Sequence, residues 1–227
     1  VQNSLKGLFS KKRNFNIITK SDQFYEYDYH IPLMSTLKLL NVEDIKSCKV
    51  SEIFLNNKEQ KKWDKFFNKN EFNIGITWQG NPTHQDDERG GKFSRSFSLK
   101  NLSFLRNIRN VNVFNLQKNF GYEQINELGY LDFIHDFGKS YDNGRIAFCD
   151  SIYVIKNLDL VITYDTSIAH QAGSLNIPVW TMLKFMPDWR WLLDKSNTHW
   201  YPSMKLYRQK QLGNWTDVFQ EVQDDLK

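Results

Sequence analysis

The sequence predicts an α/β fold, a doubly wound parallel sheet, for residues 70–227. Two observations lead to this prediction. Short apolar runs alternate with segments of helical periodicity along this part of the chain, and the connections between them are short. Alternation of this kind places parallel strands side by side and covers both faces of the sheet with helices. Short crossovers between parallel strands are right-handed, which restricts the topology further.

The first 69 residues are expected to form a partial, truncated α/β domain on the acceptor side. The chain begins at Val1 in what reads like the middle of a folded segment, so an N-terminally shortened chain is expected. Pro32 suits the start of a helix, where its missing N–H costs nothing. The elements expected here are a strand at 15–19, a strand running into a helix at 28–40, a linker at 56–58 and a helix at 58–69.

Residues 70–227 are expected to form a Rossmann-like domain. Apolar runs predict strands at 73–78, 111–116, 158–164, 178–183 and 204–208, and a short strand within 131–137. Apolar residues spaced three or four apart predict helices at 101–108, 121–128, 150–158, 166–175, 188–194 and 214–226. Asp150 is expected to cap its helix. The last helix is expected to pack back on the N-terminal part.

Composition and charge narrow the function classes. The chain has 30 basic and 26 acidic residues, a net charge of +4, which permits an anionic substrate without requiring nucleic acid. Two distant cysteines, Cys48 and Cys149, exclude a disulfide scaffold and disfavour a cysteine-based zinc site. No apolar run approaches the length of about 20 residues that spans a bilayer. A cytoplasmic protein without a transmembrane segment is expected.

The stretch LDLVITYDTSIAHQAG (158–173) holds the main functional signal. An apolar strand ends at Tyr164, and Asp165, Thr166 and Ser167 follow where a helix should begin. Free amides and the dipole make a helix N-terminus at this edge an anion site. Asp165 is expected to cap the helix, and His170 shares a face with Ser167. The alternative is that these polar residues only cap the helix and that His170 is structural.

The loop that follows the strand at 73–78 should overhang the same edge. It is long and rich in Gly and Asn, with Gly80 and Asn81 at its start, and such loops are commonly functional. Arg89, Lys92 and Arg95 lie in it, and arginine suits bidentate phosphate contacts. Asp86 and Asp87 form a candidate metal pair, although solvated loop carboxylates are the simpler interpretation.

Two further segments could complete such a site. Gln117 and Lys118 follow the strand at 111–116, where Lys118 could reach a phosphate or a ribose. Near the C-terminus, Trp189, Trp191, Trp200 and Tyr201 could stack on a nucleobase, or else pack in the core. Neither GxGxxG nor GxxxxGK[ST] is present, so a diphosphate site here would lack a glycine-rich loop.

Several motifs together resemble a known family. They are GITWQGNPTHQDDER with RSFSL, NLQK, LDLVITYDTSIAHQAGSLNIPVW, PDWRWLL, and WYPSMKLYRQ with GNW. In this order they resemble the C-terminal half of TPR-linked bacterial glycosyltransferases. These are related to glycosyltransferase family 9, the ADP-heptose:lipopolysaccharide heptosyltransferases, and more distantly to the O-linked N-acetylglucosamine transferases. The resemblance is close over residues 73–225 and looser over 1–70.

The resemblance implies a GT-B fold whose C-terminal domain binds a nucleoside-diphosphate sugar without a metal or other cofactor. The amides of Thr166 and Ser167 would hold the diphosphate, Arg95 would neutralise the leaving group, and His170 would lie behind the phosphate loop. Gln117 and Lys118 would lie near the ribose or phosphate. The acceptor would be a saccharide, lipopolysaccharide or protein.

One departure from the family limits this expectation. The family's N-terminal domain opens with a Gly-Leu-Gly-Asp type of loop where the acceptor base is expected, and this chain has no such motif. The acceptor-side catalytic segment is therefore expected to be missing, with a homodimer as one way to complete the first domain. The alternative function is a non-catalytic nucleotide-binding or interaction module that retains the fold.

Overall fold

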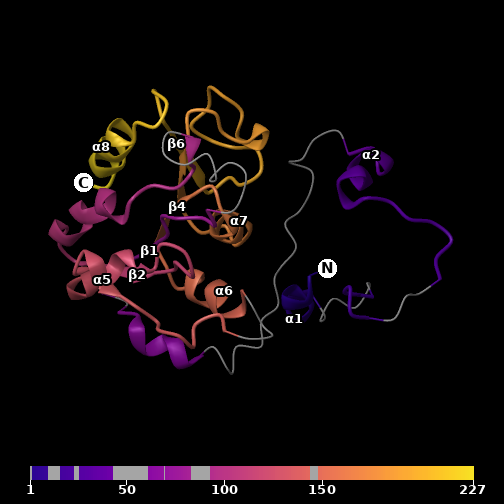
Figure 1. The fold of residues 1–227 in the computed structure, drawn as a ribbon, viewed down its shortest axis with the longest axis horizontal. Helices are drawn as coiled ribbons and strands as arrows, with labels where there is room; N and C mark the ends of the chain where they lie inside the picture. Colours follow the sequence, from indigo (N-terminus) through magenta and orange to yellow (C-terminus); the bar gives the residue numbers. More distant parts are fainter. Residues whose placement is uncertain are drawn as a thin grey trace.

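The computed structural model describes residues 2–9, 16–22, 26–42, 61–68, 70–82, 93–143 and 148–227. Its centre is a sheet of six parallel strands (Figure 1). The strands are β1 (Phe72–Ile76), β2 (Val111–Asn115), β3 (Ile134–His135), β4 (Leu160–Tyr164), β5 (Val179–Leu183) and β6 (Met204–Arg208). All five residues of β4 are buried, as expected of a central strand covered on both faces. The α/β prediction is confirmed.

The strand order indicates where on the sheet a ligand would bind. The order is β3-β2-β1-β4-β5-β6, with β1 beside β4. The chain thus winds outward from β1 in one direction and from β4 in the other. Ligands bind such sheets outside the carboxyl ends of the strands at this reversal point. The loops after β1 and β4 therefore lie at the expected binding position.

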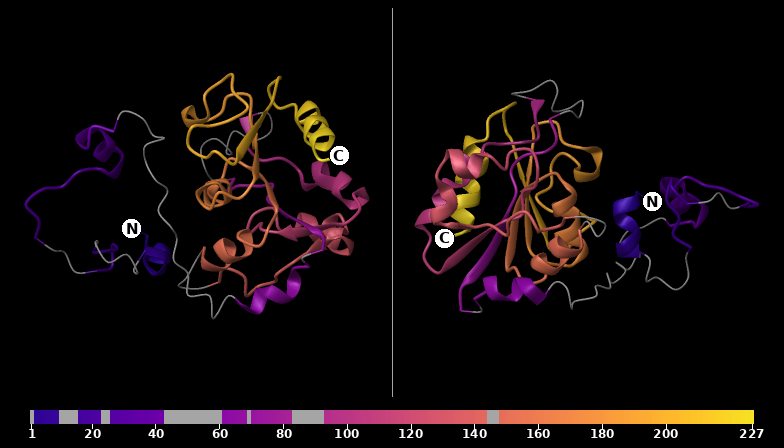
Figure 2. Two further views of the ribbon diagram at one scale, coloured as in Figure 1. Left: turned by 180° about the vertical axis from the view of Figure 1, so that it is seen from behind. Right: turned by 60° about the horizontal axis from the view of Figure 1, so that its bottom comes forward.

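Helices cover both faces of the sheet (Figure 2). On one face lie η6 (Leu99–Asn107), α5 (Gln124–Glu127) and α8 (Thr216–Asp225). Val218, Phe219 and Val222 of α8 are buried in the same cluster as Phe97, whose ring centroid is 4.7 Å from that of Phe219. The last helix therefore packs on this face of the sheet.

The other face carries α6 (Cys149–Ile155) and α7 (Ser167–Ser174), with η4 (Lys61–Phe66) beside them. Trp63 of η4 is buried against Phe137 and Tyr141, and the Tyr153 hydroxyl donates to Asp64 at 2.6 Å. This helical turn precedes the expected domain boundary at residue 70 but packs with the sheet. Short turns η7 (Tyr130–Asp132) and η8 (Trp189–Trp191) complete the domain.

Local geometry differs from the sequence expectation in two places. The segment at 99–107 has the predicted apolar spacing, with Leu99, Leu102 and Leu105 buried, but it forms a 3₁₀ helix instead of an α-helix. Asp150 lies inside the first turn of α6 instead of capping it. The carboxylate of Asp142 accepts from the amides of Asp150 and Ser151 at 2.9 and 3.2 Å, so Asp142 is the cap.

The N-terminal segments are separate from the sheet in Figures 1 and 2. They contain η1 (Asn3–Leu5), α1 (Lys6–Phe9), η2 (Leu33–Ser35) and α2 (Thr36–Leu39). The described residues between 2 and 42 include no strand, so the strand expected at 15–19 is not found over 16–19. The candidate linker at 56–58 lies outside the described residues. Within the described ranges, no helix has the length and apolar content that a bilayer span requires.

Candidate functional site

Two cavities open beside the N-terminus of α7, at the carboxyl ends of β1 and β4. Cavity 1 has a volume of about 400 Å³, and cavity 2 one of about 610 Å³. Thr166 and Ser167 line both, so the start of α7 forms the partition between them. Both volumes fall in the range of small-molecule sites, roughly 300–1,000 Å³.

The N-terminus of α7 begins one residue later than the sequence suggested. Thr166 is the N-cap, with an extended backbone at φ −149° and ψ 173°, and its side chain makes no capping hydrogen bond. Asp165 lies one residue before the N-cap and lines cavity 2. The prediction that Asp165 caps this helix is therefore wrong. The first amides of a helix have no acceptor within the helix. Here the side chain of the N-cap residue, Thr166, does not accept a hydrogen bond from them either. These donors and the dipole face the two cavities.

Cavity 1 gathers six of the residues that the sequence singled out. These six residues come from the strand ends and from the start of α7: Gly80, Asn81, Gln117, Lys118, Thr166 and Ser167. The amide of Gly80 donates to the Ser96 hydroxyl at 3.0 Å, which joins the two ends of the loop after β1. The predicted convergence of the ends of β1, β2 and β4 is thus observed.

The side chain of Gln117 connects the ends of β1 and β2. Its Oε1 atom accepts from the amides of Trp78 and Gln79, both at 3.0 Å. Its Nε2 atom donates to the carbonyls of Gln79 at 2.6 Å and Phe120 at 2.7 Å. The amide group is buried and fully engaged with the backbone. Gln117 therefore shapes the wall of cavity 1 and holds its loops in place.

Lys118 also makes contacts within the protein. Its Nζ atom donates to the carbonyls of Tyr141 and Asp142, each at 2.6 Å. This ties the residues before α6 to the end of β2. Lys118 lines cavity 1, and the partners of its ammonium group are carbonyl oxygens of the segment before α6.

Asp142 was not singled out from the sequence, yet it lines cavity 1. Its carboxylate caps α6, and its own amide donates to the carboxylate of Asp150 at 3.0 Å. Burial raises the pKa of Asp142, while its hydrogen bonds to Ser151 lower it. The backbone of Asp142 has a positive φ of 46°, which the reciprocal contact with Asp150 holds in place. Apart from its Asp-Asn-Gly turn composition, no sequence signal marks it.

Cavity 2 contains the cationic part of the site. It is lined by Phe93, Arg95, Asp165, His170, Lys184, Met186, Pro187, Asp188 and Arg190, besides the two shared residues. Arg95 is half-buried and faces this cavity, on the other side of the α7 N-terminus from Lys118. The Arg190 guanidinium pairs with Asp188 at 3.2 Å. Arg89, Lys92, Asp86 and Asp87 lie outside the described residues.

His170 is held by aromatic neighbours. Its Nδ1 atom lies 2.9 Å from the hydroxyl of Tyr201, and its ring stacks on Trp191 with centroids 5.4 Å apart. Burial lowers the pKa of His170, and Arg190 lowers it further against the opposite effect of Asp165 and Asp188. The imidazole is therefore neutral near pH 7.

The aromatic residues near the C-terminus divide between packing and exposure. Trp191 is buried in the core, and the indole N–H of Trp200 donates to the carbonyl of Arg190 at 3.1 Å. Tyr201 packs on α7. Trp189 remains exposed. Packing thus accounts for three of the four predicted stacking candidates. Among the described residues, no three His, Cys, Asp or Glu side chains are grouped as a metal ion would require.

Comparison with solved structures identifies the fold. The domain resembles E. coli ADP-heptose LPS heptosyltransferase II, with a TM-score of 0.50, 15% identity, and coverage of 77% of this chain and 52% of that one. It also resembles a glycosyl transferase family 9 protein from Veillonella parvula, with a TM-score of 0.54, 10% identity, and coverage of 86% and 51%. At these identities the likeness shows the fold alone. The fold is that of glycosyltransferase domains.

The chain spans about half the length of these two structures. No family model matches it, and no curated protein matches it. The sequence resemblance to glycosyltransferase family 9 is therefore confirmed as a likeness of fold. The links to TPR proteins and to O-linked N-acetylglucosamine transferases remain predictions.

Proposed function

We propose that this domain is the nucleotide-sugar-binding half of a glycosyltransferase. The observation that supports the proposal is the pair of cavities that meet at the N-terminus of α7, beside the reversal point of the sheet. A nucleoside-diphosphate sugar has three parts in line. The nucleoside would occupy cavity 1, the diphosphate would lie at the amides of Thr166 and Ser167, and the sugar would extend into cavity 2.

The charges beside the α7 N-terminus suit this arrangement. A diphosphate gains from the free amides and the helix dipole. Arg95 in cavity 2 would neutralise charge on the phosphate that leaves the sugar, and Asp165 would accept a hydrogen bond from a sugar hydroxyl. His170, engaged with Tyr201, would keep the first turns of α7 in place as a positioning residue.

The proposed reaction is transfer of the sugar to an acceptor hydroxyl. The bond between the anomeric carbon and the phosphate oxygen breaks, and its electron pair stays on the diphosphate. The acceptor oxygen then bonds to the anomeric carbon and loses its proton to a base. Arg95 and the α7 amides would stabilise the charge that develops on the diphosphate in the oxocarbenium-like transition state. The base is expected on the acceptor side, outside this domain, and no metal is required.

Calorimetric titration with ADP, UDP and GDP tests the nucleotide site directly. Saturable binding of one of them in the micromolar to millimolar range is expected, while the matching free sugar alone should bind weakly. Absence of binding by all three would contradict the proposal. Binding without hydrolysis or transfer of the matching nucleotide sugar would favour the alternative function, a non-catalytic nucleotide-binding module.

A further inference from the structure

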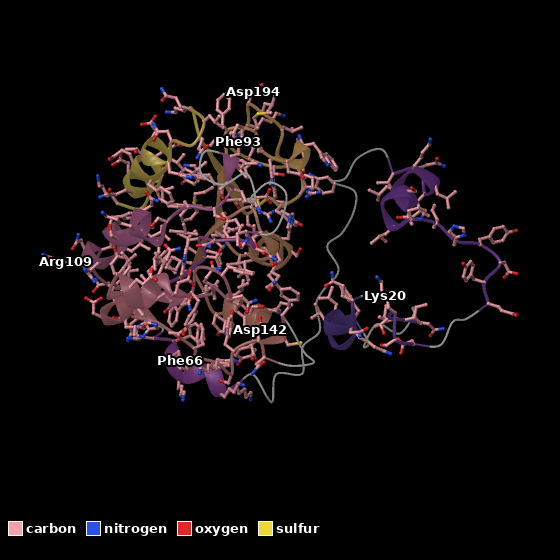
Figure 3. The ribbon with its side chains drawn as sticks, viewed as in Figure 1. Lys20, Phe66, Phe93, Arg109, Asp142 and Asp194 are labelled. Carbon is pink, nitrogen blue, oxygen red and sulfur yellow. The ribbon has the colours of Figure 1, made fainter. Side chains whose placement is uncertain are left out.

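Cavity 1 has an acidic residue, Asp142, in its wall. Figures 1 and 3 share one view, in which Asp142 lies beside α6. In the same view Phe93, which lines cavity 2, lies on the opposite side of α7. The acidic side of the site is therefore separated from the cationic lining of cavity 2 by the start of α7.

The carboxylate of Asp142 has capacity for a further donor. Its Oδ1 atom accepts from the amides of Asp150 and Ser151 at 2.9 and 3.2 Å. These two bonds do not use Oδ2. Because a buried charge is costly unless donors surround it, a ligand hydroxyl that reached Oδ2 from cavity 1 would stabilise the carboxylate.

The wall around Asp142 has an unusual backbone. Three non-glycine residues of positive φ line cavity 1: Asn119 at 59°, Asp142 at 46° and Phe148 at 70°. For a bulky aromatic residue such a φ is a genuine outlier. Lys118 holds this wall, since its Nζ atom donates to the carbonyls of Tyr141 and Asp142. Conformations of this kind persist where neighbouring contacts fix them, and they concentrate at ligand sites.

The deep part of cavity 1 offers a second acceptor. Oγ1 of Thr163 donates to the carbonyl of Tyr164 at 3.0 Å, and it lies 2.5 Å from Oγ1 of Thr77. A hydroxyl has a single proton, so both bonds exist together only if Thr77 donates to Thr163. Thr77 lines cavity 1 and is 3% exposed. Its oxygen is thus an acceptor toward a ligand, in contrast to the amide donors at the start of α7.

These acceptors determine which part of a nucleotide lies beside them. A carboxylate repels phosphate, and the proposed place of the diphosphate is at Thr166 and Ser167. The nucleoside remains, with its ribose hydroxyls and the donors of its base. Phe120 lines the same cavity and is 43% exposed, so its ring suits stacking on the base. The ribose joins the base to the phosphate, and its two neighbouring hydroxyls match the acceptors deeper in the cavity.

We propose that Asp142 accepts a hydrogen bond from the 2′-hydroxyl of a ribose, so that cavity 1 selects ribonucleoside diphosphates over their 2′-deoxy forms. The inference rests on the proposed function, since it requires the nucleoside to occupy cavity 1. A carboxylate has the same role toward ribose in dinucleotide-binding α/β folds. Asp142 contributes to the choice of donor and takes no part in the transfer of the sugar.

Calorimetric titration with ADP, UDP, GDP and their 2′-deoxy forms tests the proposal. The wild-type protein should bind the matching ribonucleotide at least about tenfold more tightly than its 2′-deoxy form, as for a lost hydrogen bond to a charged group. Asp142→Asn should bring this ratio to about one, because an amide nitrogen in place of Oδ2 cannot accept. Asparagine caps helices as well as aspartate does and tolerates a positive φ, so the variant should fold.

Asp136→Asn is the matched control. It removes the same charge from a half-buried side chain that directly follows β3 and lies outside both cavities. Its ratio of the two affinities should equal that of the wild type. If Asp142→Asn does not fold, Asp142→Gly replaces it, because glycine adopts a positive φ freely. This variant should also lose the preference for the ribonucleotide.

The outcomes distinguish this inference from the proposed function. If none of the nucleotides binds, both are wrong. If the wild-type protein binds a ribonucleotide and its 2′-deoxy form equally, the nucleotide site stands and the role of Asp142 is overturned. A purely structural role of Asp142 would weaken both forms by the same factor and leave the ratio unchanged, which would also overturn the proposal. Equal binding of GDP and 2′-deoxyGDP alone, lost in Asp142→Asn, would assign Asp142 to the donor edge of guanine in place of ribose.

Discussion

The hydroxyl oxygen of Tyr201 lies 2.9 Å from Nδ1 of His170, and the ring of the same tyrosine packs against Gly173. The tyrosine therefore contacts two residues of α7 that lie almost one helical turn apart. A Cβ atom at residue 173 would come within 2.4 Å of Cγ of Tyr201. These contacts fix the position of α7, and with it the amides at Thr166 and Ser167 that separate the two cavities.

Gly173→Ala should destabilise the domain by about 1–3 kcal/mol, because the added methyl group overpacks against the root of the Tyr201 ring. Helix propensity alone predicts the opposite sign, with alanine better than glycine by about 1 kcal/mol. Urea denaturation of the two proteins measures the difference. In a Tyr201→Ala background the same substitution should be neutral or stabilising. A more stable Gly173→Ala protein in the wild-type background would show that the tyrosine moves aside.

The stability of the domain should depend on the protonation of His170. Burial lowers its folded-state pKa below the ordinary 6.5. The unfolded chain therefore takes up a proton at higher pH than the folded one, so the stabilisation is complete above pH 6.5 and declines as the pH falls toward the folded pKa. Urea denaturation at about pH 7.5 and about pH 5.5 measures this loss. His170→Gln should show a smaller loss over the same interval, and an unchanged pH dependence would contradict the assignment to His170.

The sequence was sufficient to predict the sheet because buried parallel strands are nearly continuous apolar runs. LVITY at β4 and NIGI within β1 are examples, and both elements were found within two residues of their predicted bounds. Helix type was less predictable. The leucines of η6 have the spacing of an α-helix, but three-residue spacing also fits the 3₁₀ geometry that the structure adopts.

The site was predictable at the level of strand ends but not of individual contacts. Parallel strands bring their carboxyl ends to one edge, which was enough to bring Gly80, Gln117 and Thr166 together. Periodicity cannot say which carbonyls lie within reach of a side chain. The sequence therefore could not predict the hydrogen bonds of Gln117 and Lys118 to backbone groups. It could not predict the capping of α6 by Asp142 either.

Lys118→Met should weaken binding of the matching nucleoside and of its nucleotide to the same degree, by about 1–3 kcal/mol. The reason is that Lys118 donates to the carbonyls of Tyr141 and Asp142, so its loss loosens a wall of cavity 1. Calorimetry with both ligands measures the two losses. Lys139→Met is the matched control, because it removes the same charge from an exposed position three residues before Asp142. A loss confined to the nucleotide would instead indicate a direct contact of Lys118 with phosphate.

Arg95→Ala should reduce nucleotide affinity by about 1–3 kcal/mol through the loss of a charge-assisted contact with the diphosphate. The matching nucleoside, which has no phosphate, should bind as before. Arg106→Ala provides the comparison, since Arg106 is paired with Asp132 at 2.8 Å and lies outside both cavities. Equal nucleotide affinity of the Arg95→Ala and wild-type proteins in calorimetric titration would remove Arg95 from the proposed site.

The amide of Ser167 can be tested by itself. Ser167 is the first residue of α7, a position where proline fits a helix, and the extended backbone of Thr166 suits a residue before proline. Ser167→Pro should therefore keep the fold but remove one N–H donor from the partition between the cavities. We expect nucleotide affinity to fall by about 1–3 kcal/mol, as for a lost hydrogen bond to a charged group. Ser167→Ala removes the hydroxyl and keeps the amide, so it should bind nearly as the wild type does. If the alanine variant lost as much affinity as the proline variant, while circular dichroism showed both to be folded, the hydroxyl of Ser167 would be the donor to phosphate in place of its amide.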